Sequence, residues 1–208
     1  MHLFYPLEET LKGLTDLPIS LAALVIALLL RKEKITKPEQ RLWGLFALIL
    51  AYSAFLGAAV HTLDLGEGFR KAVWVILFPG LYALGCTMYL ILTRAMPNGS
   101  RSVRPWLLIP AAVGLLASEI LMLLGNDADI LVFVAFGVLA VVPAFVRIFR
   151  RGFGWKHLGA MMLLLLAAAL CQVLSFVSPY LVAVEHVFML AAFVFYLKLA
   201  QYAIRQAG

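Results

Sequence analysis

Seven long apolar segments dominate this sequence and limit what it can fold into. A helix needs about 20 mainly apolar residues to cross a bilayer. Because these segments are continuous rather than alternating, and because backbone groups in hydrocarbon must satisfy their own hydrogen bonds, we expect each to be a helix and not a barrel strand. The expected helices cover about 17–30, 42–63, 72–93, 105–124, 130–147, 157–177 and 180–200. The first of these is short, so a start before Asp16 stays open. The sequence therefore predicts an all-α polytopic membrane protein, a single seven-transmembrane-helix domain over residues 1–208.

The composition supports a chain solvated mainly by lipid. Hydrophobic residues make up 64% of it and charged residues 13%, whereas about a quarter of the residues in soluble domains are charged. The net charge of +6 comes from residues at the ends of the apolar segments, so we expect no nucleic-acid binding. Residues 1–18 carry acids and no basic region, and therefore do not resemble a cleavable signal. Short loops and this N-terminus favour a bacterial inner membrane.

Basic residues alternate between the predicted loops. Fourteen of the 17 Lys and Arg residues fall in the first, third and fifth loops and at the C-terminal end, and three fall on the other side. Because Lys and Arg accumulate in cytoplasmic loops, we expect the N-terminus outside and the C-terminus in the cytoplasm. Most of the acids map to the outer half: Asp16, Asp64, Glu67, Glu119, Asp127, Asp129 and Glu185. Acids hardly affect insertion, so a cation or polar-ligand site at the outer face is one explanation.

Two histidines are the strongest candidates for chemistry. His61 ends the second apolar segment and His186 lies early in the seventh, which places both at a similar depth on the outer side. Neutral imidazole is a common ligand for zinc, copper and iron, and carboxylates complete such sites. The alternative is two separate histidines at the membrane interface. The acids that could complete a metal site are Asp16, Asp64, Glu119 and Glu185.

Small and polar residues share one face of the second segment. Ser53, Gly57, His61 and Asp64 are spaced by four, four and three residues, and helical residues at such spacings are neighbours. Small residues let a second helix approach closely, so helix packing is the favoured interpretation of Ser53 and Gly57.

Seven helices, an outer N-terminus and histidines late in helix two and early in helix seven resemble the CREST superfamily of membrane hydrolases, which includes the alkaline ceramidases and the progestin and adipoQ receptors. The chain is also similar to bacterial seven-helix proteins of uncharacterised function through Thr-Asp-Leu-Pro at 15–18 and Gly-Ala-Ala-Val-His at 57–61. The CREST resemblance implies a zinc site with His61 and His186 as ligands and lipids as substrates.

The match to the CREST site pattern is partial. The pattern places a second helix-seven histidine at Leu190 and a serine at Gly57, and neither residue is present. Asp64 matches the aspartate of the pattern, although it lies closer to the histidine than in the ceramidases. Asp16 or Glu185 would then have to substitute as a zinc ligand.

Three hypotheses about function remain open from the sequence. The first is a zinc-dependent membrane hydrolase that cleaves an amide or ester in a lipid, with Asp64 or Glu119 as the general base. The second is a non-catalytic seven-helix protein that binds membrane lipids or another ligand, or that serves as the membrane subunit of a complex. The third is a haem protein with His61 and His186 as axial ligands.

Overall fold

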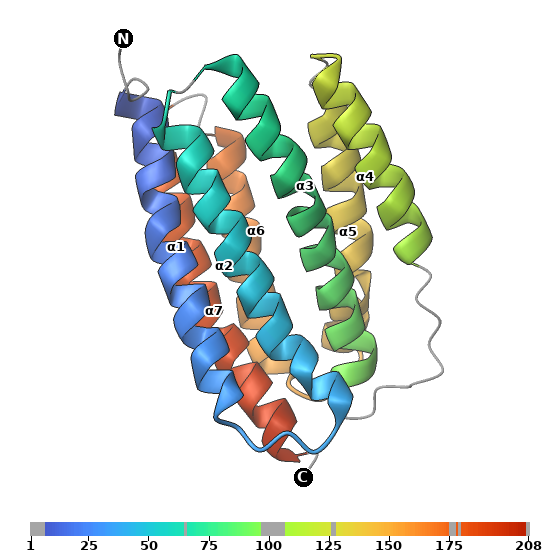
Figure 1. The fold of residues 1–208 in the computed structure, drawn as a ribbon. Helices are drawn as coiled ribbons and strands as arrows, with labels where there is room; N and C mark the ends of the chain where they lie inside the picture. The colour runs from blue at the N-terminus through green and yellow to red at the C-terminus, as the bar shows by residue number, and fades with distance from the viewer. Residues whose placement is uncertain are drawn as a thin grey trace.

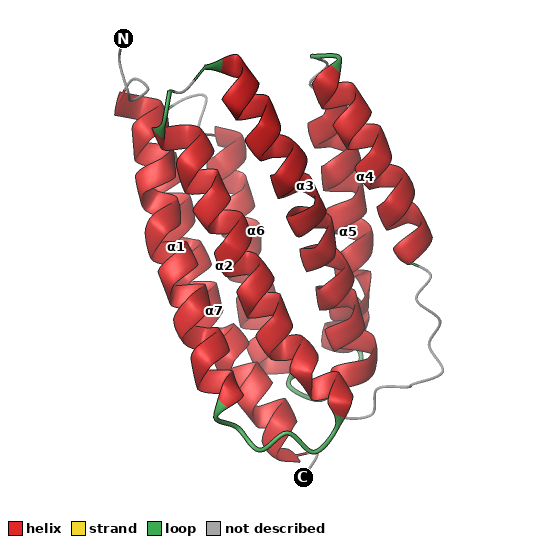
Figure 2. Ribbon diagram, in the orientation of Figure 1, coloured by secondary structure: helices red, strands yellow, loops and turns green. Residues whose placement is uncertain are grey.

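The computed structural model describes residues 7–64, 66–96, 107–125, 128–174, 178 and 180–206. The elements of this part are helical (Figure 2). The α-helices are α1 (Leu7–Arg31), α2 (Arg41–Thr62), α3 (Glu67–Leu90), α4 (Leu108–Leu123), α5 (Ala128–Phe149), α6 (Trp155–Leu174) and α7 (Leu181–Gln206). A 3₁₀ turn, η1 (Pro38–Gln40), precedes α2, and a π-helical turn, η2 (Ile91–Ala95), continues α3. The prediction of an all-α fold with seven helices is confirmed.

Four helical stretches are long and apolar enough to cross a membrane. They are Gly13–Arg31, Pro38–Thr62, Glu67–Ala95 and Leu181–Gln206. Within the described residues, three further apolar stretches are shorter: Leu108–Leu123, Ala135–Phe149 and Trp155–Cys171. Many large apolar side chains on these helices are also exposed, among them Leu21, Phe55 and Leu163. A helical protein with this surface is an integral membrane protein, because water would not solvate it.

The helices form a bundle in which each packs against the next one along the chain (Figure 1). Helix α1 lies between α2 and α7, and α6 packs against α7. Helices α3, α4 and α5 form the other side of the bundle. Because α1 also contacts α7, residues from the beginning and the end of the chain meet inside the protein.

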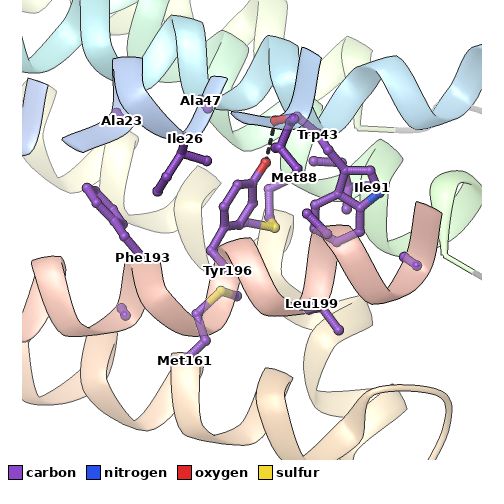
Figure 3. Close-up of a cluster of buried hydrophobic side chains, with 14 of the residues drawn as sticks. Ala23, Ile26, Trp43, Ala47, Met88, Ile91, Met161, Phe193, Tyr196 and Leu199 are labelled. Carbon is purple, nitrogen blue, oxygen red and sulfur yellow. Dashed lines mark hydrogen bonds between the residues drawn. The ribbon is translucent and has the colours of Figure 1, made fainter. Parts of the chain in front are cut away.

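The larger of two buried clusters joins α1, α2, α6 and α7 with the end of α3 and η2 (Figure 3), and Ala144 of α5 also belongs to it. Its polar element is Tyr196, whose hydroxyl donates to the backbone carbonyl of Trp43 at 2.6 Å. Alanines such as Ala23 and Ala47 are fully buried where α1 meets α2, which allows close approach of the two backbones. The smaller cluster joins α3, α4 and α5 around Tyr82, whose hydroxyl and that of Ser118 lie 2.9 Å apart.

The first helix is longer than the sequence predicted. It begins at Leu7 rather than at about residue 17, and it includes Asp16 and Pro18. Apolar runs mark the part of a helix that lipid can solvate, not the extent of its hydrogen bonds, so the sequence left a start before Asp16 open and did not locate it at Leu7. Asp16 therefore lies inside α1, where its side chain contacts α2 and α7.

Candidate functional site

A carboxylate–imidazole pair joins α1 to α7 inside the bundle. Nε2 of His186 lies 3.0 Å from Oδ1 of Asp16, and these two residues are 170 positions apart in the chain. The His186 ring is nine-tenths buried and the Asp16 side chain is four-fifths buried. Ionisable groups at such positions in membrane helices usually face the bundle interior and mark functional sites.

The hydrogen bond at Nδ1 of His186 determines what its other ring nitrogen, Nε2, can offer to Asp16. Nδ1 faces the carbonyl oxygen of Val182, one helical turn earlier. A carbonyl can only accept, so Nδ1 carries a hydrogen and donates it. In the neutral ring, Nε2 therefore presents a lone pair to a carboxylate. Two acceptors at 3.0 Å repel each other unless a proton or a metal ion lies between them. A proton there makes the pair an ordinary imidazolium–carboxylate ion pair.

Gly57 of α2 makes room for this arrangement. A Cβ at position 57 would lie 2.8 Å from Oδ2 of Asp16, which is closer than side chains tolerate. The carboxylate of Asp16 thus occupies the space that a serine side chain at position 57 would fill. The interpretation of Gly57 as a close-packing residue is correct, and the group packed against it is an ionisable one.

Glu185 is the third ionisable group of this region. It lies close enough to Asp16 and His186 to interact electrostatically with both. Its Oε2 atom is buried and has no hydrogen-bond partner among the described residues. A buried carboxylate oxygen without a partner is costly, and such atoms often mark a site for an ion or a ligand that completes their coordination.

The contacts recorded for the other candidate residues involve different neighbours. The His61 ring meets the Trp74 ring of α3 edge-on, with the ring centres 6.3 Å apart. Among the described residues, no hydrogen bond or ion pair joins Asp64 or Glu119 to Asp16 or His186. Glu119 follows Ser118, which belongs to the Tyr82 cluster of α3, α4 and α5. Asp127 lies outside the described residues.

A preformed cluster of ligands is not seen. In residues 7–64, 66–96, 107–125, 128–174, 178 and 180–206, no group of three or more His, Cys, Asp or Glu side chains is arranged to hold a metal ion. Leu190, where the CREST pattern places a histidine, packs against the larger apolar cluster. The site therefore consists of the Asp16–His186 pair, with Glu185 nearby.

Comparisons with known proteins identify a family and nothing finer. Neither a curated protein nor a solved structure matches the chain. Residues 11–203 match a family described as a family of unknown function, DUF6962. The matched region includes both Asp16 and His186. Because the match covers nearly the whole sequence, the chain belongs to the DUF6962 family.

Proposed function

We propose that this protein binds a divalent transition-metal ion, zinc by its resemblance to the CREST hydrolases, between α1 and α7. Asp16 and His186 are the first two ligands in this proposal, and Glu185 is the third. The metal lies in the outer half of a bundle with seven membrane-spanning helices, an outer N-terminus and a cytoplasmic C-terminus, in a bacterial inner membrane.

The observation that carries the proposal is the orientation of the His186 ring. Histidines that bind metals commonly donate their second N–H to a carbonyl or carboxylate, which fixes the ligating nitrogen and its direction. Nδ1 of His186 faces the Val182 carbonyl, and Nε2 is turned toward an acid. These partners of the two ring nitrogens are the ones expected for a histidine that binds a metal ion.

The donor set also fits zinc. Two ligands about 2.0 Å from a tetrahedral zinc ion lie roughly 3.3 Å apart, and the observed separation of Nε2 and Oδ1 is 3.0 Å. The unpartnered Oε2 of Glu185 provides a further anionic donor, which would take the role that Leu190 cannot. Bound there, zinc would supply a water of lowered pKa for attack on a lipid amide or ester, the reaction class of the hydrolases that the chain resembles.

Metal analysis of the purified protein tests the proposal. We expect about one zinc ion per wild-type chain, and loss of that ion in Asp16→Asn and His186→Ala. His157→Ala is the matched control, because His157 lies at the start of α6 and contacts Phe195 rather than the pair. A wild-type protein without metal, or metal retained in both site variants, would overturn the proposal and leave Asp16 and His186 as a proton-sharing pair.

Glu185→Gln and His61→Ala determine the rest of the ligand set. If Glu185 is the third ligand, Glu185→Gln weakens zinc binding by at least about tenfold, whereas His61→Ala leaves it unchanged. The opposite result would replace Glu185 by His61 as the third ligand and require α2 to rotate toward α1.

A further inference from the structure

A cavity of about 770 Å³ lies at the other end of the bundle, far along the helices from Asp16. Its walls come from α4, α5, the end of α3 with η2, and the turn before α6. Tyr89, Leu92 and Pro110 form the side opposite α5. This is the end that carries most of the basic residues of the chain, and the metal proposal does not involve it.

One face of α5 gives the cavity an amphiphilic wall. The residues on this face recur at intervals of three and four and therefore lie in one row. They are Leu139, Val142, Pro143, Val146, Arg147 and Arg150. The apolar part, 139–146, extends for about 12 Å at 1.5 Å per residue, and two guanidinium groups follow it. Leu139, Val142 and Val146 are each more than two-fifths exposed, so the cavity opens on the surface of the bundle.

Arg147 is held in place and is not neutralised. Its Nε donates to the carbonyl of Leu92 at 2.6 Å, which ties α5 to η2. Its side chain is part-buried, and among the described residues no carboxylate forms an ion pair with it or with Arg150. A part-buried cation in a largely apolar cavity is costly without a counter-ion. The terminal nitrogens of Arg147 remain as fixed donors, which suit phosphate oxygens.

We propose that this cavity binds an anionic phospholipid. The phosphate lies on Arg147 and Arg150, and one acyl chain follows the row from Val146 to Leu139. Basic pockets between helices at the cytoplasmic side are a recognised way to bind anionic headgroups, and the charge pattern of the chain places this end there. Along α5 the apolar residues of the row come first and the two arginines come last. A phospholipid in a bilayer has the same order, with its acyl chain in the interior and its headgroup at the surface.

The test measures lipid retention by native mass spectrometry of the purified full-length protein. The probes are phosphatidylglycerol and phosphatidylcholine with the same acyl chains. We expect wild type to retain phosphatidylglycerol preferentially, and Arg150→Gln to lower that preference roughly fivefold. Arg147→Gln is expected to lower it at least as much. Arg150 is the cleaner position, because it follows the last residue of α5 and, unlike Arg147, has no side-chain hydrogen bond or ion pair recorded among the described residues.

Lys156→Gln is the matched control, because it removes one exposed positive charge at the same end of the bundle but outside the cavity. It is expected to bind phosphatidylglycerol as wild type does. Equal retention of the two lipids, or equal loss in Lys156→Gln and Arg150→Gln, would show general charge attraction and overturn the proposal. Displacement of phosphatidylglycerol by millimolar inorganic phosphate alone would also overturn it, since the ligand would then be a free anion.

Discussion

The carboxylate of Asp16 lies against Gly57, in space that any larger residue at position 57 would need. A Cβ there would come within 2.8 Å of Oδ2 of Asp16. Since the other oxygen of the same carboxylate is the partner of His186, a change on α2 acts on the pair between α1 and α7. Gly57 is therefore a positioning residue for a site in which it makes no polar contact.

The substitution Gly57→Ala should disturb the pair more than it disturbs the fold. The Asp16 carboxylate must move away, while alanine favours the helix by up to about 1 kcal/mol. We expect a change in the ¹⁵N shifts of the His186 ring, which report the proton or metal at Nε2, together with a small change in thermal stability. Gly44→Ala is the control on the same helix, since a Cβ at position 44 meets nothing within 4 Å. Unchanged His186 shifts in Gly57→Ala would contradict the positioning role.

Gly13→Ala should destabilise the contact between α1 and α2. A Cβ at position 13 would collide with Oγ1 of Thr62 and lie 2.6 Å from the backbone oxygen of Ala58. A backbone atom cannot avoid the clash by a rotamer change, so α1 and α2 must separate. We expect a loss of about 1–3 kcal/mol in the free energy of unfolding, measured by thermal denaturation in detergent. Gly159→Ala on α6, where a Cβ meets nothing, should be neutral or stabilising, and equal effects of the two substitutions would contradict this explanation.

The apolar cluster should depend on the Tyr196 hydroxyl. Tyr196→Phe removes the O–H that donates to the Trp43 carbonyl and keeps the ring contacts with Trp43 and Phe46. A buried hydrogen bond contributes about 1 kcal/mol, so a decrease of that size is expected in the same denaturation assay. Tyr202→Phe is the control, because the Tyr202 ring stacks on Phe153 near the surface. A loss in Tyr202→Phe as large as in Tyr196→Phe would mean that the buried bond is not the cause.

The helices were predictable because lipid-solvated segments are apolar over their whole length, and this pattern is local. The start of α1 at Leu7 was not predictable, since its first turns are polar and only the backbone structure shows that they are helical. Asp16, Glu185 and His186 could be selected as candidates from their residue types and depth. Their grouping could not, because it depends on the packing of α1 against α7, 170 residues apart.

The amphiphilic face of α5 has a recognisable pattern in the sequence. The row from Leu139 to Arg150 has helical spacing and ends in two arginines, so an amphiphilic face of α5 could have been predicted. The bond from Arg147 to the Leu92 carbonyl could not, because it requires the π-helical turn η2. The role of Gly57 likewise follows from a contact with another helix and not from its own neighbours in the chain.

Glu33 links the loop after α1 to the end of α7 and should make part of the stability pH-dependent. Its carboxylate accepts hydrogen bonds from Arg205, at 2.8 and 3.2 Å, and from Gln201 at 3.0 Å. The hydrogen bond from Arg205 is the main cause that lowers the pKa of Glu33 below its ordinary value of 4.5. An acid with a lowered pKa in the folded state stabilises the fold above its unfolded pKa. That contribution is lost as the pH falls through the lower, folded pKa.

The expected contribution of Glu33 is therefore complete above about pH 4.5 and disappears at more acidic pH. It is at most about 1 kcal/mol, because the Arg205 side chain is largely exposed and water and salt screen the pair. Melting temperatures of wild type and Glu33→Gln, compared between pH 3 and pH 7, measure it as the difference between the two proteins. The difference should be largest at neutral pH and low salt and should shrink as the pH approaches 3. A difference that stays constant with pH would show that Glu33 acts through the packing of the loop and not through its charge.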